Sequence, residues 1–235
     1  MRLIHVIAAA TVSAFVGFSS QAAVVIQPTA VMATSEFTFG PMPASNLINA
    51  SEFNPGDVAL IANGASVPGT WPMAQPTRPG GSYGSGFPGF GNETSTLPKV
   101  VFDLGAFYDI TSIALWNGQE TAGYWTAVED VNAYAVSSYG LTVPGSGANA
   151  LLFNISPNVN AANGPQIRAL TLTNTRYILL DVISGQDPGI IGLAGSGHAE
   201  FLEVRFVGDL TVIPEPTSLA LIGASGLLAL RRRRA

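Results

Sequence analysis

The sequence has no cysteine, few charged side chains and almost no histidine. Of its 235 residues, 11% are Asp, Glu, Lys or Arg, and the two histidines are His5 and His198. The absence of cysteine excludes disulfide bonds, thiol catalysis and cysteine-ligated zinc. A site built on two imidazoles is excluded as well, because His5 lies in an N-terminal stretch with the pattern of a cleaved leader.

Positive charge is scarce between the two ends of the chain. Arg2 and Arg231 to Arg234 are five of the ten Lys and Arg residues, so residues 23–213 hold 5 basic and 14 acidic side chains, a formal charge of −9. Such a surface repels phosphate, which excludes nucleic acid as a partner. The 47% hydrophobic fraction is too high for a disordered chain, while 26 Gly and 16 Pro predict many loops.

The first 22 residues have the composition of a secretory signal peptide. Arg2 precedes an apolar stretch over residues 3–18, and Ser20-Gln21-Ala22 is a small-x-small cleavage site. The alternative is a permanent anchor helix, but the apolar stretch is about 16 residues long and a membrane span needs roughly 20. We therefore expect cleavage after Ala22 or Ala23, and an exported mature protein.

The C-terminal segment, residues 212–235, combines a proline motif, an apolar run and a basic end. Pro214 and Pro216 flank Glu215, residues 219–230 are apolar, and the basic end is Arg231, Arg232, Arg233 and Arg234. The prolines delay the helix until Thr217 or Ser218, either of which can cap it. That helix would rise about 20 Å, short of the ~30 Å hydrocarbon core, and the arginines favour the cytoplasmic side. The pattern predicts a chain held only transiently in a membrane.

This tripartite tail resembles the PEP-CTERM sorting signal of Gram-negative bacteria that make exopolysaccharide. The resemblance implies that an exosortase-type processing enzyme cleaves near Pro214-Glu215-Pro216. It also implies transient insertion in the inner membrane, followed by release to the cell surface or the extracellular matrix. The alternative is a short tail anchor that matches the signal by chance.

Residues 24–210 show the pattern of an all-β domain. Short runs of Val, Ile, Leu, Tyr and Phe alternate with clusters of Gly, Pro, Asn and Ser. The predicted strands are residues 24–26, 29–35, 99–104, 110–116, 131–137, 150–155, 166–173, 177–183 and 199–207. Their spacing predicts a β-sandwich. Residues 51–98 have no strand signal and are expected to form a long loop, and a helical turn is expected near residues 45–48.

Polar residues within the predicted strands each suggest a structural role. In the last strand, Leu202, Val204 and Phe206 alternate with Glu203 and Arg205, which places the apolar three on one face. We expect Glu203 to face outward, as an exposed partner of Arg205.

Two acidic residues in the predicted strands, Asp103 and Asp181, are also expected to have structural roles. Trp116 is expected in the core. Asp103 follows Phe102 at a strand end, where an Asp side chain can accept backbone hydrogen bonds as an Asx-type turn residue. Asp181 interrupts an apolar strand, and Arg176 or Arg168 is its expected partner.

Six segments, taken in order, resemble the discoidin or coagulation-factor C-type family. They are residues 33–37 (ATSEF), 43–49 (PASNLIN), 100–105 (VVFDLG), 110–117 (ITSIALWN), 176–180 (RYILL) and 201–206 (FLEVRF). The resemblance covers about residues 28–208 and implies a galactose-binding-like jelly-roll β-sandwich. This chain departs from the pattern in its long 51–98 interval and in Asn49, where Asp is commoner.

Four side chains are candidates for contact with a sugar. Trp125, Tyr124 and Trp71 fall outside the predicted strands, and aromatic rings can stack on the C–H faces of sugars. His198 precedes the closing strand, in a loop where the resemblance implies ligand contact for sugar-binding members. The alternative is that these side chains fold back over the end of the sandwich, or, for His198, that it is a neutral loop residue.

The resemblance also implies one structural calcium ion, held by Asn49, Glu203 and nearby carbonyl oxygens. Asn49 lacks the charge of the commoner Asp, and a pairing of Glu203 with Arg205 is the alternative. No paired carboxylates, metal cluster or nucleophile elbow can be recognised, so we expect no enzyme. The leading hypothesis is an exported protein that binds extracellular polysaccharide. The alternative is a structural or adhesive matrix protein with no defined small ligand.

Overall fold

The structure is a computed structural model that describes residues 22–36, 43–50, 53–72, 83–84, 97–117, 128–153, 164–185 and 200–211. The expected signal peptide and sorting signal lie outside these residues. Among the helices of the described ranges, none is long and apolar enough to cross a membrane.

The described residues form an antiparallel β-structure with two short helices, which confirms the predicted all-β class. The strands are β1 (Val24–Ile26), β2 (Ala30–Ala33), β3 (Tyr83–Gly84), β4 (Lys99–Asn117), β5 (Val128–Val136), β6 (Asn149–Leu152), β7 (Gln166–Gly185) and β8 (Glu200–Leu210). A 3-10 helix, η1 (Ala44–Ile48), confirms the predicted turn, and α1 spans Pro55–Val58. The short β3 falls in the interval that we expected to lack strands, so that expectation was wrong there.

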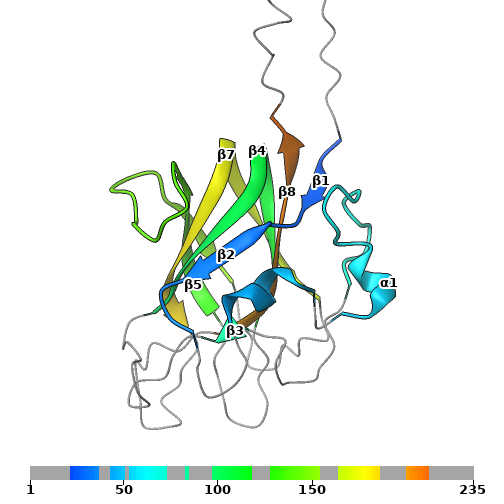
Figure 1. The fold of residues 1–235 in the computed structure, drawn as a ribbon, viewed down its shortest axis with the longest axis horizontal. Helices are drawn as coiled ribbons and strands as arrows, with labels where there is room; N and C mark the ends of the chain where they lie inside the picture. Colours follow the sequence, from blue (N-terminus) through cyan, green and yellow to red (C-terminus); the bar gives the residue numbers. More distant parts are fainter. Residues whose placement is uncertain are drawn as a thin grey trace, which may run out of the picture.

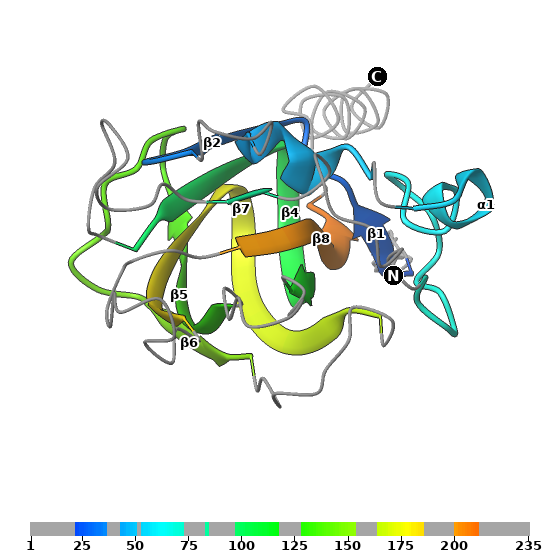
Figure 2. The ribbon, with the colours of Figure 1, turned by 90° about the horizontal axis from the view of Figure 1, so that it is seen from below.

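Two long strands allow one sheet to curl around a single core. The strand order is β1-β8-β4-β7-β5-β6, with β2 on β4 and β3 on β8. Residues 99–103 of β4 pair with β2 and with the second half of β7, whereas residues 108–117 pair with β8 and the first half of β7. The sequence predicted two strands in each of β4 and β7. The structure joins each pair into one bent strand, and the strands surround the core in Figure 2.

The bend in β4 lies at Gly105, where the chain takes a left-handed φ of 80°. Asp103 Oδ1 accepts the Gly105 N–H at 2.8 Å, which confirms the predicted Asx-type turn. Asp103 also binds Arg176 through two bonds, Nε–Oδ1 at 2.8 Å and Nη2–Oδ2 at 2.9 Å. These bonds to Arg176 hold the pKa of Asp103 below its usual value. The predicted partners of Asp181 were wrong, because β4 brings Lys99 Nζ to 3.5 Å from its Oδ1.

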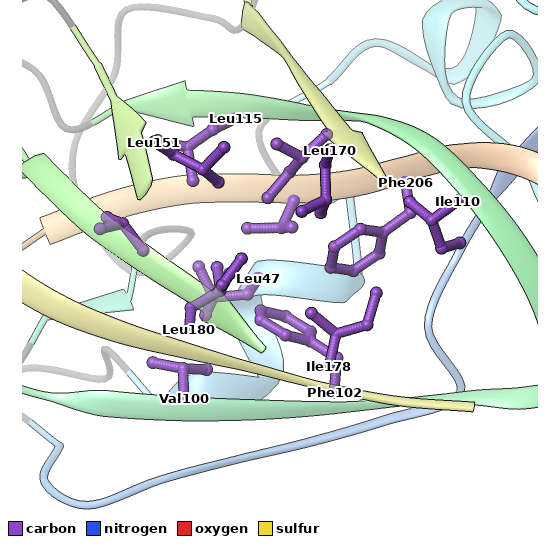
Figure 3. Close-up of a cluster of buried hydrophobic side chains, with 14 of the residues drawn as sticks. Leu47, Val100, Phe102, Ile110, Leu115, Leu151, Leu170, Ile178, Leu180 and Phe206 are labelled. Atoms are coloured by element: carbon purple, nitrogen blue, oxygen red, sulfur yellow. The ribbon is translucent and has the colours of Figure 1, made fainter. Parts of the chain in front are cut away.

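The main core lies inside the curled sheet. β1, β4, β5, β6, β7 and β8 all contribute to it, and Leu47 of η1 enters among their side chains (Figure 3). Val204 and Phe206 of β8 belong to this core, as the alternation predicted. The Phe206 ring meets the Phe102 ring edge to face, with centroids 5.5 Å apart.

A second apolar cluster covers the opposite face of β8 and β4. Ala114, Trp116 and Leu202 meet Phe53 and Ile61, which come from the interval that we expected to be a loop. Residues 53–72 of that interval pack beside β1 and contain α1 (Figure 1), with Val25 N donating to Ala65 O at 2.8 Å.

Leu202 therefore does not share the face of Val204 and Phe206, and this part of the predicted pattern was wrong. A register shift between Trp116 and Asn117 places Trp116 opposite Glu203 and Asn117 opposite Phe201. The extra residue, Leu202, is turned to the other face, as in a β-bulge.

Candidate functional site

One end of the sheet gathers the ends of most strands. Leu115 pairs with Gln166, Asn117 with Phe201, and Val128 with Gly185, so the end of β4 lies beside the starts of β7 and β8, and the start of β5 beside the end of β7. The end of β2 and the start of β4 meet there too. We call this end of the molecule, the lower one in Figure 1, the connecting end.

An asparagine clamps the base of one connection at this end. The Asn117 side chain accepts the Val128 N–H at 2.9 Å and donates to the Val128 carbonyl at 2.7 Å. It thereby joins the last residue of β4 to the first of β5, across the connection 118–127 that contains Tyr124 and Trp125. This clamp was not predicted from the sequence, where its signal is an Asn directly before a segment without strand pattern.

Two further connections have bases held by side chains. Arg168 Nε donates to the Leu152 carbonyl, and the guanidinium carbon of Arg168 lies 5.6 Å from the Phe153 ring centroid, beside the connection 154–163. The Ser184 hydroxyl accepts the Asp130 N–H at 3.1 Å and donates to Asp130 Oδ2 at 2.7 Å. This pair joins the end of β7 to β5, where the connection 186–199 with His198 begins.

Trp71 is the predicted sugar-contacting residue that the structure describes. It is half-buried and meets Trp116 edge to face, with centroids 5.7 Å apart. Trp116 is 1% exposed, as expected of a core residue, and its Nε1 donates to the Pro72 carbonyl at 3.0 Å. The backbone at Pro72 is therefore tied to the second apolar cluster. Trp125, Tyr124 and His198 lie outside the described residues, and their ligand roles remain predictions.

Glu203 and Arg205 form a buried ion pair between β8 and the layer that covers it. Each is 1% exposed, so the expectation of an exposed pair was right about the partner and wrong about the exposure. Arg205 Nη1 donates to Glu203 Oε1, and the Ala50 N–H donates to Oε2 at 2.7 Å. Arg205 Nε reaches the Ile61 carbonyl at 2.9 Å. The pair therefore links the segments around Ala50 and Ile61 to β8.

Burial dominates the electrostatics of this pair. It raises the pKa of Glu203, whereas the Arg205 charge and the Ala50 N–H favour the carboxylate. Burial also lowers the pKa of Arg205. Both directions follow from the cost of removing a charge from water. Each partner thus depends on the other for compensation.

The predicted calcium ligands do not fit a cation in this arrangement. Both carboxylate oxygens of Glu203 accept N–H donors, and one donor is the positive guanidinium of Arg205. Asn49 turns its amide nitrogen toward Asn46 Oδ1, at 3.0 Å. A calcium ion needs free oxygen ligands and excess negative charge. Within the described ranges, no group of three His, Cys, Asp or Glu residues could hold a metal either.

The sorting-motif residues Pro214, Glu215 and Pro216 and the terminal arginines Arg231 to Arg234 lie outside the described residues. Their role stays a prediction.

No protein-family model and no curated protein matches the chain. Among solved structures, the family 32 CBM of C. perfringens NanJ in complex with galactose matches with a TM-score of 0.44 and 14% identity, over 79% of this chain and 98% of that one. A family 89 glycoside hydrolase from Clostridium perfringens matches at 0.43 and 19%, over 82% of this chain and 16% of that one. The fucolectin from striped bass serum matches at 0.46 and 12%, over 76% and 46%. At these scores the likeness assigns neither a family nor a ligand to this chain.

Proposed function

We propose that this protein is an exported, non-enzymatic glycan-binding protein that uses the connecting end of a galactose-binding-like β-sandwich. The observation that carries the proposal is the set of side-chain clamps at that end. Asn117, Arg168 and Ser184 each secure the base of a connection, and one of these connections contains Tyr124 and Trp125. Fixed bases reduce the ordering cost that a binding loop pays when it meets a ligand.

The chemistry of these connections suits a sugar. Aromatic rings offer flat apolar faces to sugar C–H groups, and amides and hydroxyls can bind sugar hydroxyls. The scarcity of basic side chains argues against a phosphate-rich partner. The buried carboxylate of Glu203 is committed to Arg205 and Ala50, so it is not available as a catalytic acid or base.

Replacing Trp125 by alanine tests the sugar site. We expect Trp125→Ala to weaken binding to exopolysaccharide at least about tenfold, or about 1.4 kcal/mol, because the ring that stacks on the sugar is lost. Affinity electrophoresis and a glycan array measure the change. The control is Phe107→Ala, which removes a 42% exposed ring on β4 next to its bend, away from the connecting end.

Two other outcomes of this experiment would contradict the proposed sugar site or the proposed function. Unchanged binding by Trp125→Ala would contradict the proposed site. If the wild-type protein binds no glycan at all, the function is instead that of a structural or adhesive matrix protein without a defined small ligand.

We further propose that the C-terminal segment sorts the protein to the cell surface or the matrix after an exosortase-type enzyme cleaves near Pro214-Glu215-Pro216. The order of proline motif, apolar run and arginine cluster supports this. Mass spectrometry of protein recovered from the extracellular matrix should show residues 1–22 and the terminal arginines absent. Exported protein that retains Arg234 would contradict the proposal.

A further inference from the structure

An open pocket lies far from the connecting end. The pocket has a volume of about 490 Å³ and is lined by Ala135, Val136, Ser137, Ser138, Gly140, Thr142 and Pro144. β5 starts at the connecting end with Val128 and reaches the pocket at Val136. Eight steps of about 3.4 Å place the pocket roughly 27 Å along the strand from that end. No residue proposed above for sugar binding lines it.

Packing holds the wall of this pocket in place. Leu141 and Val143, next to the lining residues, pack against a third apolar cluster of Val101, Tyr134 and Leu179. This cluster lies on the outer face of the sheet, since Ile178 and Leu180 on either side of Leu179 belong to the main core. The segment that forms the pocket is therefore anchored to the sheet before any ligand arrives, as in most small-molecule sites.

The lining combines hydroxyl groups with apolar surface and carries no charge. Ser137, Ser138 and Thr142 contribute hydroxyls, each able to donate and to accept a hydrogen bond. Ala135, Val136 and Pro144 contribute apolar surface, and none of the seven lining residues is ionisable. A matching ligand has hydroxyl groups, apolar C–H faces and no charge. The volume of the pocket also lies in the ordinary range for sites that bind small ligands.

The surrounding charges disfavour an anion. Arg176 is the cation on the strand beside β5 here, since its neighbour Tyr177 pairs with Val136. Its guanidinium is held by both carboxylate oxygens of Asp103 and lies 5.1 Å from the Tyr177 ring centroid. The positive charge of Arg176 is therefore already compensated by Asp103. The −9 formal charge of residues 23–213 adds a repulsive field.

From these observations we propose that the pocket binds a neutral sugar residue. The site is separate from the connecting end, so the proposal stands or falls independently of the function proposed above. If both sites are occupied, a single molecule can bridge two polysaccharide chains. The second site then binds at a high effective concentration, which raises the avidity of the protein for the matrix.

Two glycines of one segment provide a matched pair of variants. A Cβ at Gly140 would lie 3.9 Å from its nearest neighbour, Ser138 Oγ, and a Cβ at Gly145 would have no neighbour within 4 Å. Neither glycine has a left-handed φ, so both positions accept a side chain without backbone strain. Gly140→Leu places a side chain at the pocket, whereas Gly145→Leu adds the same side chain outside its lining.

The experiment is an NMR titration of the full-length protein with the methyl glycosides of glucose, mannose and galactose, and with methyl glucuronoside as the charged probe. We expect at least one neutral glycoside to shift the amide signals of residues 136–142 in a saturable way. Gly140→Leu should weaken this binding at least about tenfold, and Thr142→Val, which removes a hydroxyl, should weaken it too. Gly145→Leu and Trp125→Ala should leave it unchanged. Melting curves check that all four variants fold.

Three results would overturn the proposal. They are the absence of any response at residues 136–142 to the neutral glycosides, equal binding of the glucuronoside, and a response that persists in folded Gly140→Leu.

Discussion

Arg205→Met should lower the free energy of unfolding by about 3–5 kcal/mol. The substitution leaves the carboxylate of Glu203 buried without its positive partner, and it removes the donor to the Ile61 carbonyl. A domain of this kind is stable by only ~5–15 kcal/mol, so much of the margin is lost. Urea unfolding monitored by tryptophan fluorescence measures the change, because Trp116 and Trp71 lie in the cluster beside the pair.

The matched control is Lys99→Met. Lys99 also pairs with a carboxylate, that of Asp181 at 3.5 Å, but its side chain is 33% exposed. Solvent screens such a pair, and its loss should cost less than about 1 kcal/mol. Equal costs for the two variants would contradict the burial of Arg205.

A double variant separates charge compensation from packing. Glu203→Met with Arg205→Met removes both charges, and it should be less destabilised than Arg205→Met alone. The same samples test the calcium question. With the carboxylate occupied by N–H donors, calcium should not raise the melting temperature of the wild-type protein, and a calcium-dependent rise would contradict our geometric argument.

Phe206→Ala should also cost about 3–5 kcal/mol. Phe206 is fully buried, its ring meets Phe102 edge to face, and its backbone lies between Ile26 and Ile113 in the sheet. The cavity left in the core would lie where β1, β4 and β8 meet. Thermal and urea unfolding measure the loss, with Phe107→Ala as the control in which an exposed ring is removed.

This substitution tests the register of β8. A slip of one residue would turn Phe206 to the opposite face. If Phe206→Ala and Phe107→Ala are tolerated equally, the placement of the closing strand is wrong.

Local pattern was enough to predict most strands and part of the core. Residue alternation placed Val204 and Phe206 on the core side, and the position of Trp116 in a predicted strand indicated its burial. The same reasoning failed at Leu202, because a bulge depends on how β4 and β8 align rather than on either strand alone. It also treated residues 53–72 as a loop, although their few apolar residues, such as Phe53 and Ile61, suffice to cover a strand face.

The candidate sites were predictable only in part. Composition singled out Trp125, Tyr124, Trp71 and His198, but the clamp between Asn117 and Val128 joins residues whose contact requires two strand ends to meet. The pocket beside β5 had no sequence signal, since serine, threonine, glycine and proline are also the ordinary residues of turns.

By itself, the sequence determined the all-β class, the positions of most strands, the turn at Asp103 and the absence of thiol chemistry. These follow from composition and from short-range periodicity, which act within a few residues. Tertiary structure alone decided which charges are buried and which distant partners they meet. Arg176 meets Asp103 across 73 positions, Lys99 meets Asp181, and Glu203 meets Ala50 across 153. Those partners depend on strand order and register, and burial then sets the cost of every charge, because a low-dielectric interior removes the water that would otherwise solvate it.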